Sequence, residues 1–154
     1  RMARIQNAKG LDFAIAGAPF DTASSFRSGS RFGPSAIRNI SCMMKPNNVI
    51  QQVNIMDSLT GGDLGDFPIF YAAIEAGVAG ILSDGALPIV LGGDHSITLA
   101  ELRAVAKKYG PVGLIHFDSH SDLCDEVFGE KYNHGTPFRR ALEEGLIEPS
   151  RCIQ

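Results

Sequence analysis

Short apolar runs alternate along the chain with longer stretches in which apolar residues recur at helical spacing. Buried strands are predicted by the apolar runs at residues 12–17, 88–91 and 112–117. Helices are predicted over residues 33–41, 68–84, 97–109 and 138–144. This alternation of strands and helices predicts an α/β fold with a mostly parallel sheet.

Three other segments carry weaker signals. Residues 49–56 alternate polar and apolar side chains and predict a short strand, whereas the glycine-rich residues 61–66 predict a loop. The residues from Arg151 onward resemble the opening of another strand. Because a parallel sheet without its next strand has an open edge, we expect the chain to be part of a larger domain.

The composition is that of an ordinary globular domain. The chain has 154 residues, of which 44% are hydrophobic and 20% charged, enough for one domain with a sizeable core. A formal net charge of −3 provides no basic field, so nucleic acid is not an expected partner. No apolar run reaches the roughly 18 residues of a membrane span, so membrane insertion is not expected either.

The cysteine pattern bears on the compartment. The three cysteines lie far apart and no Cys-x-x-Cys pair occurs, which predicts reduced thiols rather than disulfides or a structural zinc site. We therefore expect a cytoplasmic protein. Cys124 lies two residues beyond Asp122 and is predicted to be a buried, inert thiol.

Candidate metal ligands follow two of the predicted strands. Asp118, His120 and Asp122 come directly after the run at 112–117, and alternate residues of an extended chain face the same way. His95 follows the run at 88–91. Because sites in open α/β sheets form at the carboxyl ends of the strands, these side chains predict a metal site, which we favour over ordinary solvated polar residues.

The donor set indicates which metals and which chemistry to expect. Two imidazoles and two carboxylates without a thiolate suit Mn, Fe, Zn or Co better than Ca or Mg. His95 and His120 lie on separate strands, which suggests two ions that could hold a hydroxide between them as a nucleophile. The predicted chemistry is therefore hydrolysis, and a nucleotide site at Gly92-Gly93 is disfavoured because no phosphate-loop pattern occurs.

His134 is a candidate for proton transfer. It stands in a short loop before the helix predicted at 138–144, where it could deliver a proton to a leaving amine. On chemistry alone, a histidine that caps or packs the turn is slightly favoured. Asp94, beside His95, is expected to support the site rather than bind an ion.

Three motifs in order resemble the signatures of the ureohydrolase family, close to its agmatinase branch. They are Gly-Gly-Asp-His-Ser at 92–96, Phe-Asp-Ser-His-Ser-Asp at 117–122 and Asn-His-Gly-Thr-Pro-Phe-Arg-Arg at 133–140. The stretches at 17–21 and 31–38 resemble the same branch. The resemblance covers nearly the whole chain, and the motifs are highly specific in combination.

The resemblance implies an arginase-like three-layer α/β/α fold, incomplete in this chain, with residues 1–154 as the N-terminal part of a single ureohydrolase domain. It implies a binuclear manganese centre in which His95 binds one ion, His120 the other, Asp118 bridges both and Asp122 holds the first. His134 would be the proton shuttle. The implied reaction hydrolyses a small guanidino compound to urea and an amine through a bridging hydroxide, in a homo-oligomer, a trimer or hexamer.

One departure from the family pattern keeps alternatives open. The family completes its metal pair with an Asp-x-Asp motif, and none occurs in these residues; the acidic residue that would hold the guanidinium is also absent. The leading hypothesis is an agmatinase-like hydrolase. A guanidinobutyrase or another hydrolase of ω-guanidino acids is an alternative with equally suitable chemistry.

The front loops near Asp21 and Arg27 could decide whether the substrate has a cationic or a carboxylate tail. A mononuclear zinc amidohydrolase of the deacetylase type and a non-catalytic subunit are the further alternatives.

Overall fold

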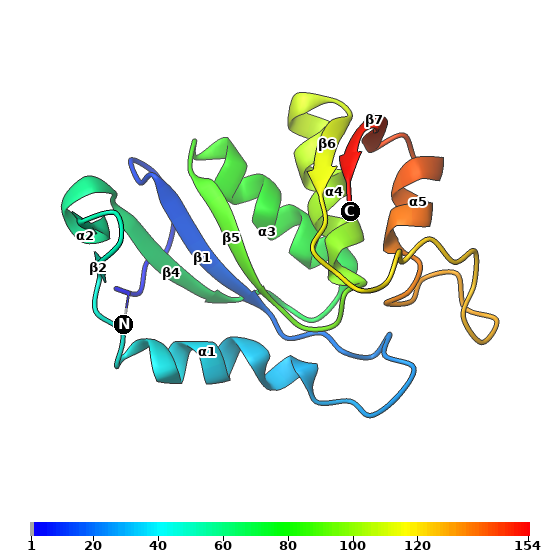
Figure 1. The fold of residues 1–154 in the computed structure, drawn as a ribbon, viewed down its shortest axis with the longest axis horizontal. Coiled ribbons are helices and arrows are strands. Elements are labelled where there is room, and N and C mark those ends of the chain that lie inside the picture. Colours follow the sequence, from blue (N-terminus) through cyan, green and yellow to red (C-terminus); the bar gives the residue numbers. More distant parts are fainter. Residues whose placement is uncertain (1) are drawn as a thin grey trace.

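The computed structural model describes residues 2–154 as an alternation of strands and helices (Figure 1). The strands are β1 (Phe13–Ala18), β2 (Asn47–Asn48), β3 (Val53–Asn54), β4 (Gly61–Asp66), β5 (Leu87–Gly92), β6 (Val112–Ile115) and β7 (Ile147–Ile153). The helices are the 3-10 turn η1 (Ser30–Phe32), α1 (Gly33–Ser41), α2 (Ile55–Ser58), α3 (Tyr71–Ser83), α4 (Ile97–Tyr109) and α5 (Pro137–Glu143). The predicted α/β class is confirmed.

The larger strands pair in parallel, as expected. They form a three-stranded sheet in the order β4-β1-β5 and a two-stranded sheet of β6 and β7, whereas β2 and β3 form a small antiparallel pair. Figure 1 shows β6 and β7 on the side of β5 that faces away from β1. Within residues 2–154, no hydrogen-bonded ladder joins β5 to β6.

Helices cover both faces of the three-stranded sheet. On β1, Ala14 and Ala16 pack in one buried cluster with Ile81 of α3. A Cβ added to Gly17, which projects to the other face, would meet Pro34 of α1. Because successive side chains of a strand point to opposite faces, α3 and α1 form the two outer layers. This is the predicted three-layer α/β/α arrangement.

A second apolar cluster joins the β6–β7 pair to the helices beside it. Leu99 and Leu102 of α4 pack against Phe138 and Ala141 of α5, and Ile147 of β7 completes the buried set. Burial of such side chains contributes about 1.5–3 kcal/mol each. The cluster matters for function because Phe138 also lies against the candidate site.

The prediction of a loop at residues 61–66 is wrong, because these residues form β4. Gly61 pairs with Phe13 and Gly62 with Ala14 in the parallel ladder. A Cβ on Gly61 would run into the Phe13 ring, and one on Gly62 into Ile5. The glycines therefore make room for neighbouring side chains in a packed sheet, a role that composition alone does not distinguish from a turn.

The strand predicted at residues 49–56 is also wrong in most of its length. Only Val53–Asn54 is extended there, and Ile55–Ser58 form a helical turn. The Asn54 side chain accepts the Met56 backbone N–H at 3.1 Å, and Asn48 accepts those of Ile50 and Gln51. Asparagine side chains thus take backbone donors that a strand ladder would otherwise use.

Smaller departures concern element ends and one cysteine. The C-terminal strand begins at Ile147 rather than near Arg151, and β6 ends at Ile115. Cys124 is exposed, so its prediction as a buried thiol is wrong. No helix among the described residues is long and apolar enough to cross a membrane.

Candidate metal centre

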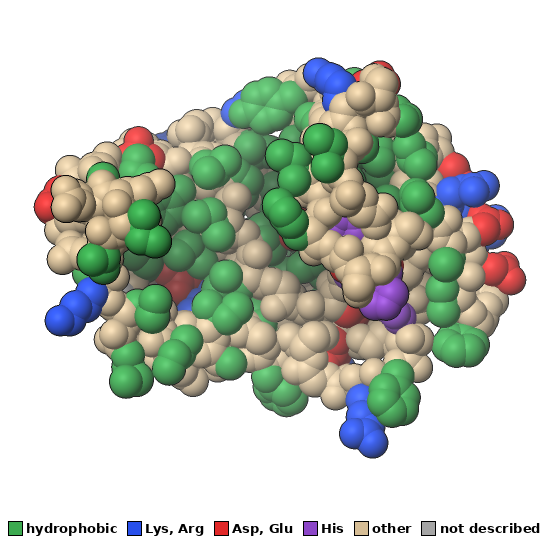
Figure 2. All heavy atoms as spheres, viewed as in Figure 1, with side chains coloured by type: hydrophobic (Ala, Val, Ile, Leu, Met, Phe, Trp, Pro, Cys, Tyr) green, Lys and Arg blue, Asp and Glu red, His purple; other side chains and the backbone are tan. Residues whose placement is uncertain are grey.

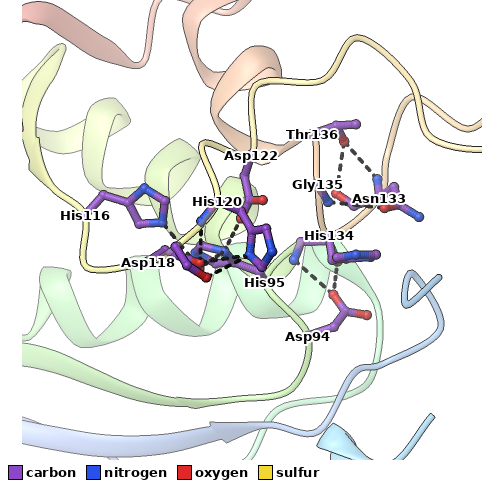
Figure 3. Close-up of polar contacts among 12 residues, drawn as sticks. Asp94, His95, His116, Asp118, His120, Asp122, Asn133, His134, Gly135 and Thr136 are labelled. Atoms are coloured by element: carbon purple, nitrogen blue, oxygen red, sulfur yellow. Dashed lines mark hydrogen bonds and ion pairs between the residues drawn. The ribbon is translucent and has the colours of Figure 1, made fainter. Parts of the chain in front are cut away.

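The ends of β5 and β6 bring four potential ligands together (Figure 3). The four are His95, just before α4, and His116, Asp118 and Asp122 in the segment after β6. Each offers one ligand atom, and these atoms all lie within 4.8 Å of one another. The structure therefore brings three of the predicted ligands together: His95, Asp118 and Asp122. Figure 2 shows histidine and acidic side chains gathered at one place on this face.

The spacing of the ligand atoms fits a transition-metal ion. His95 Nδ1 lies 2.5 Å from Asp122 Oδ2 and 3.5 Å from Asp118 Oδ2. Ligands bound at about 2.0–2.2 Å from one ion lie roughly 3–4 Å apart. The His95–Asp122 pair must open slightly to admit an ion, while the His95–Asp118 separation already suits one. Nitrogen and carboxylate donors without thiolates favour Mn, Fe, Zn or Co.

Asp122 reaches the cluster through an unusual backbone conformation. Its φ is 50°, in the left-handed region that residues with a side chain seldom occupy. The Asp122 carbonyl oxygen accepts the backbone N–H of Phe138 at 3.2 Å, and the residue is buried. Such conformations persist where the surroundings fix them, and they concentrate at functional sites.

The structure does not bring His120 into the group of four. Its side chain is 79% exposed. Its backbone N–H donates to Asp118 Oδ1 at 2.9 Å, and its Nδ1 lies 3.1 Å from the same oxygen. The backbone N–H of His120, followed by its side chain, lowers the pKa of the Asp118 carboxyl. The two oxygens of Asp118 consequently face different imidazoles: Oδ1 faces His120, and Oδ2 faces His95.

His116 is the member of the cluster that sequence reasoning missed. Its ring lies among aromatic neighbours, with centroid distances of 4.5 Å to Phe138 and 5.2 Å to His95. The available signal was the alternation itself, because residues 116, 118, 120 and 122 continue one i, i+2 series back into the strand. Within an apolar run, a histidine is not distinguished by pattern from the other residues of the strand.

His134 lies outside the cluster and binds the front loop. Its Nδ1 is 2.9 Å from the Ala23 carbonyl oxygen and its Nε2 is 3.2 Å from Ser25 Oγ. Its backbone N–H also donates to the Ala23 carbonyl oxygen at 3.3 Å. His134 thus joins the 133–136 loop to residues 23–25.

The Asp94 carboxylate accepts hydrogen bonds from two neighbouring segments. Its Oδ2 accepts the Ala23 backbone N–H at 3.0 Å, and its Oδ1 accepts the Ser96 backbone N–H at 2.9 Å. The Ser96 hydroxyl donates to the same Oδ1. With its oxygens used in this way, Asp94 fixes the turn that carries His95 and the loop that His134 contacts.

Comparison with known proteins identifies the class. The chain matches the arginase family over residues 11–154. The chain therefore belongs to the arginase family, and its fold is arginase-like. Among solved structures, proclavaminate amidino hydrolase from Streptomyces clavuligerus superposes with a TM-score of 0.92 at 35% identity, covering 100% of this chain and 55% of that one.

Two curated relatives narrow the comparison. A guanidinobutyrase from Pseudomonas aeruginosa is 48% identical over 151 residues, covering 94% of this chain and 47% of that protein. A mitochondrial agmatinase from Gallus gallus is 46% identical over 155 residues, covering 96% of this chain and 46% of that protein. The chain thus spans about half the length of the curated relatives it matches.

Manganese is present in some of the similar structures. Formiminoglutamase from Trypanosoma cruzi, solved with Mn2+2, superposes with a TM-score of 0.86 at 30% identity, covering 96% of this chain and 53% of that one.

Proposed function

We propose that the protein is a metal-dependent hydrolase that releases urea from a small guanidino compound and leaves an amine. The observation that carries the proposal is the convergence of His95, Asp118 and Asp122 at the carboxyl ends of β5 and β6 in an arginase-family chain. The two curated relatives above are named guanidinobutyrase and agmatinase, and the substrates in both names are guanidino compounds. Residues 1–154 would be the N-terminal part of the single domain that carries this activity.

The proposed centre holds two manganese ions. His95 and Asp122 would bind the first and His120 the second, with Asp118 between them. Support comes from the Asp118 carboxylate, whose Oδ2 lies 3.5 Å from His95 Nδ1 and whose Oδ1 lies 3.1 Å from His120 Nδ1. When bound, such ions supply a nucleophilic water near neutral pH and stabilise developing negative charge.

Two side chains of the protein would have further roles in the reaction, one in placing the ions and one in proton transfer. Asp118, as the shared carboxylate, would fix the separation of the two ions. His134 would carry a proton to the leaving amine through Nε2. Within residues 2–154, the one hydrogen-bond partner of this nitrogen is the exposed Ser25 hydroxyl, at 3.2 Å, so a substrate could displace the contact at low cost.

For the substrate, a carboxylate tail is favoured over a cationic one. Asp21 cannot anchor a cationic tail, because it is buried and its oxygens accept from Arg31 Nε at 2.6 Å and the Gly29 backbone N–H at 2.7 Å. Hydrogen bonding from Arg31 lowers the pKa of Asp21 to about 2. Arg27 is exposed on the same loop and makes no ion pair within the described residues. An ω-guanidino acid such as guanidinobutyrate is therefore proposed ahead of agmatine.

We also propose a homo-oligomer, a trimer or hexamer, for the assembled enzyme. Exposed apolar side chains on α1, among them Ile37 and Ile40, support an interface between copies. Light scattering after gel filtration measures the mass directly. A monomer at working concentration would contradict this part of the proposal.

The test is a urea assay on the protein encoded by the complete gene, loaded with manganese. Guanidinobutyrate, agmatine and an acetyl-lysine peptide are compared. Urea from guanidinobutyrate at the highest kcat/KM is expected, with the peptide untouched. Arg27→Gln should raise KM for guanidinobutyrate about tenfold and leave agmatine unchanged, whereas Lys45→Gln, an exposed cation elsewhere, should change neither.

Each rival predicts a different result in this assay. Deacetylation without urea indicates a zinc amidohydrolase of the deacetylase type. If no urea is released from any guanidino compound, a non-catalytic subunit is favoured. Agmatine as the preferred substrate leaves the reaction class intact and overturns the choice of tail.

A further inference from the structure

His116 carries a buried nitrogen with no hydrogen-bond partner. The residue is 8% exposed, and its Nε2 is one of only two buried side-chain N or O atoms in residues 2–154 that lack a partner. Most buried polar atoms in folded proteins are paired, because an unpaired one forfeits its hydration without compensation. An orphaned imidazole nitrogen within a group of candidate metal ligands therefore indicates an interaction that a bound ion or a small movement of a neighbour would complete.

The nearest charged acceptor is the carboxylate at the centre of the site. His116 Nε2 lies 3.6 Å from Asp118 Oδ2, slightly too far for a hydrogen bond. In Figure 3, Asp118 lies between His116 and His95. His116 Nε2 thus faces the same oxygen, Oδ2, that His95 Nδ1 faces at 3.5 Å, and the centroids of the two imidazole rings are 5.2 Å apart.

The ring of His116 is held firmly, whereas the hydrogen bonds to the Asp118 carboxylate within residues 2–154 involve Oδ1 and leave Oδ2 able to adjust. Phe138 packs against the ring at a centroid distance of 4.5 Å, and Phe138 is itself buried in the cluster of α4, α5 and β7. The Asp118 side chain is 27% exposed and stands in an irregular segment. A movement of less than 1 Å by Asp118 closes the contact.

We propose that His116 is a positioning residue for Asp118, donating from Nε2–H to Oδ2 and fixing the orientation of the carboxylate that the two ions share. The inference rests on the proposed function, because the contact matters only if Asp118 binds metal. Partners of this kind orient ligands, and their loss lowers metal affinity about 10–100-fold without removing an ion.

Two substitutions of His116 distinguish the effect of its hydrogen-bond donor from the effect of the packing of its ring. His116→Phe keeps an aromatic ring against Phe138 and removes the donor, and His116→Gln restores an amide donor in place of Nε2. Free Mn2+ is titrated by electron paramagnetic resonance on the protein encoded by the complete gene, which yields both the number of ions and their affinity. Thermal unfolding of the metal-free proteins is measured beside it.

The phenylalanine variant should hold the same number of ions at roughly 10–100-fold lower affinity, and the glutamine variant should recover affinity to within about threefold. The metal-free midpoint of His116→Phe should be no lower than that of the unsubstituted protein, since the change replaces an unpaired buried atom by an apolar one. A purely structural role would lower that midpoint.

Two outcomes overturn the inference alone: unchanged affinity in His116→Phe, or loss of a whole ion, which would make His116 a direct ligand. If the unsubstituted protein binds no Mn2+, the proposed function fails, and this inference fails with it.

Discussion

His95 Nδ1 lies 2.5 Å from Asp122 Oδ2 across 27 positions of the chain. The contact joins the turn after β5 to the segment after β6. Within residues 2–154, no hydrogen-bonded ladder joins these two strands. It depends on the left-handed backbone of Asp122, which turns the carboxylate inward. Backbone conformation and packing thus contribute to the placement of both side chains.

Asp122 should contribute both to metal binding and, separately, to the stability of the left-handed turn in which it lies. Asp122→Asn should keep the fold, because asparagine tolerates φ near 50°, but should weaken binding of the first ion at least tenfold through loss of the carboxylate. Asp122→Ala should add a loss of about 1 kcal/mol in unfolding free energy. Mn2+ titration and denaturant unfolding measure the two effects. Equal metal affinity in Asp122→Asn and the unsubstituted protein would remove Asp122 from the ligands.

His120 should hold the second ion. His120→Ala should bind one Mn2+ per chain instead of two, because a lost imidazole leaves its ion with an incomplete shell. Its unfolding free energy without metal should change by less than about 0.5 kcal/mol, since the side chain is 79% exposed. Metal counting on the purified variant is sufficient. Two ions at undiminished affinity would show that the exposed position in the structure is the working one and that His120 is no ligand.

His134 should act on the leaving group and not on the ions. His134→Ala should lower kcat about 10²–10⁴-fold while the metal content stays at the level of the unsubstituted protein. Ser25→Ala is the matched control, because it removes the hydroxyl that Nε2 contacts and leaves the imidazole in place. Its turnover should stay within about twofold. A parallel loss of metal and activity in His134→Ala would instead indicate a role in building the site.

The sequence pattern predicted best those segments in which the conformational preference of each residue agrees with its place in the fold. Pro34 lies in the first turn of α1, one residue after its start at Gly33, and Gly85 ends the turn after α3 with φ of 88°, both consistent with their backbone chemistry. The convergence of His95 with Asp118 and Asp122 followed from strands ending at one edge.

Other features depended on contacts between distant residues. The glycines of β4 resembled a loop because the Phe13 and Ile5 side chains that fill their space lie elsewhere in the chain. The sequence pattern does not distinguish His116 from a strand residue, because its contacts with Phe138 and His95 arise from tertiary packing. The place of His120 outside the group of four likewise depends on its own side-chain orientation, which spacing does not determine.

Glu101 should make stability depend on pH. It lines a cavity of about 510 Å³ among apolar side chains of α3, β5 and α4, and burial raises its pKa from 4.5 to about 7. The folded state therefore keeps this proton between about pH 4.5 and 7 while the unfolded chain has released it, so this carboxyl lowers stability as pH rises through that window.

Glu101→Gln removes that titration. The variant should gain on the order of 2 kcal/mol in unfolding free energy at pH 8 relative to the unsubstituted protein, and little near pH 4.5. Denaturant unfolding across pH gives the difference directly, with Glu126→Gln, at an exposed carboxyl, as the control. A difference between Glu101→Gln and the unsubstituted protein that does not vary with pH would contradict the account of the cavity.

The central claim is that the cluster at the ends of β5 and β6 works through bound metal on a guanidino substrate. The most direct measurement is the rate of urea release from guanidinobutyrate by the complete protein before chelation, after verified removal of metal, and after Mn2+ is restored. The account predicts that the rate falls at least about 100-fold on removal and returns with Mn2+. Urea release at the full rate from ion-free protein, or no urea from protein carrying two ions per chain, would contradict it.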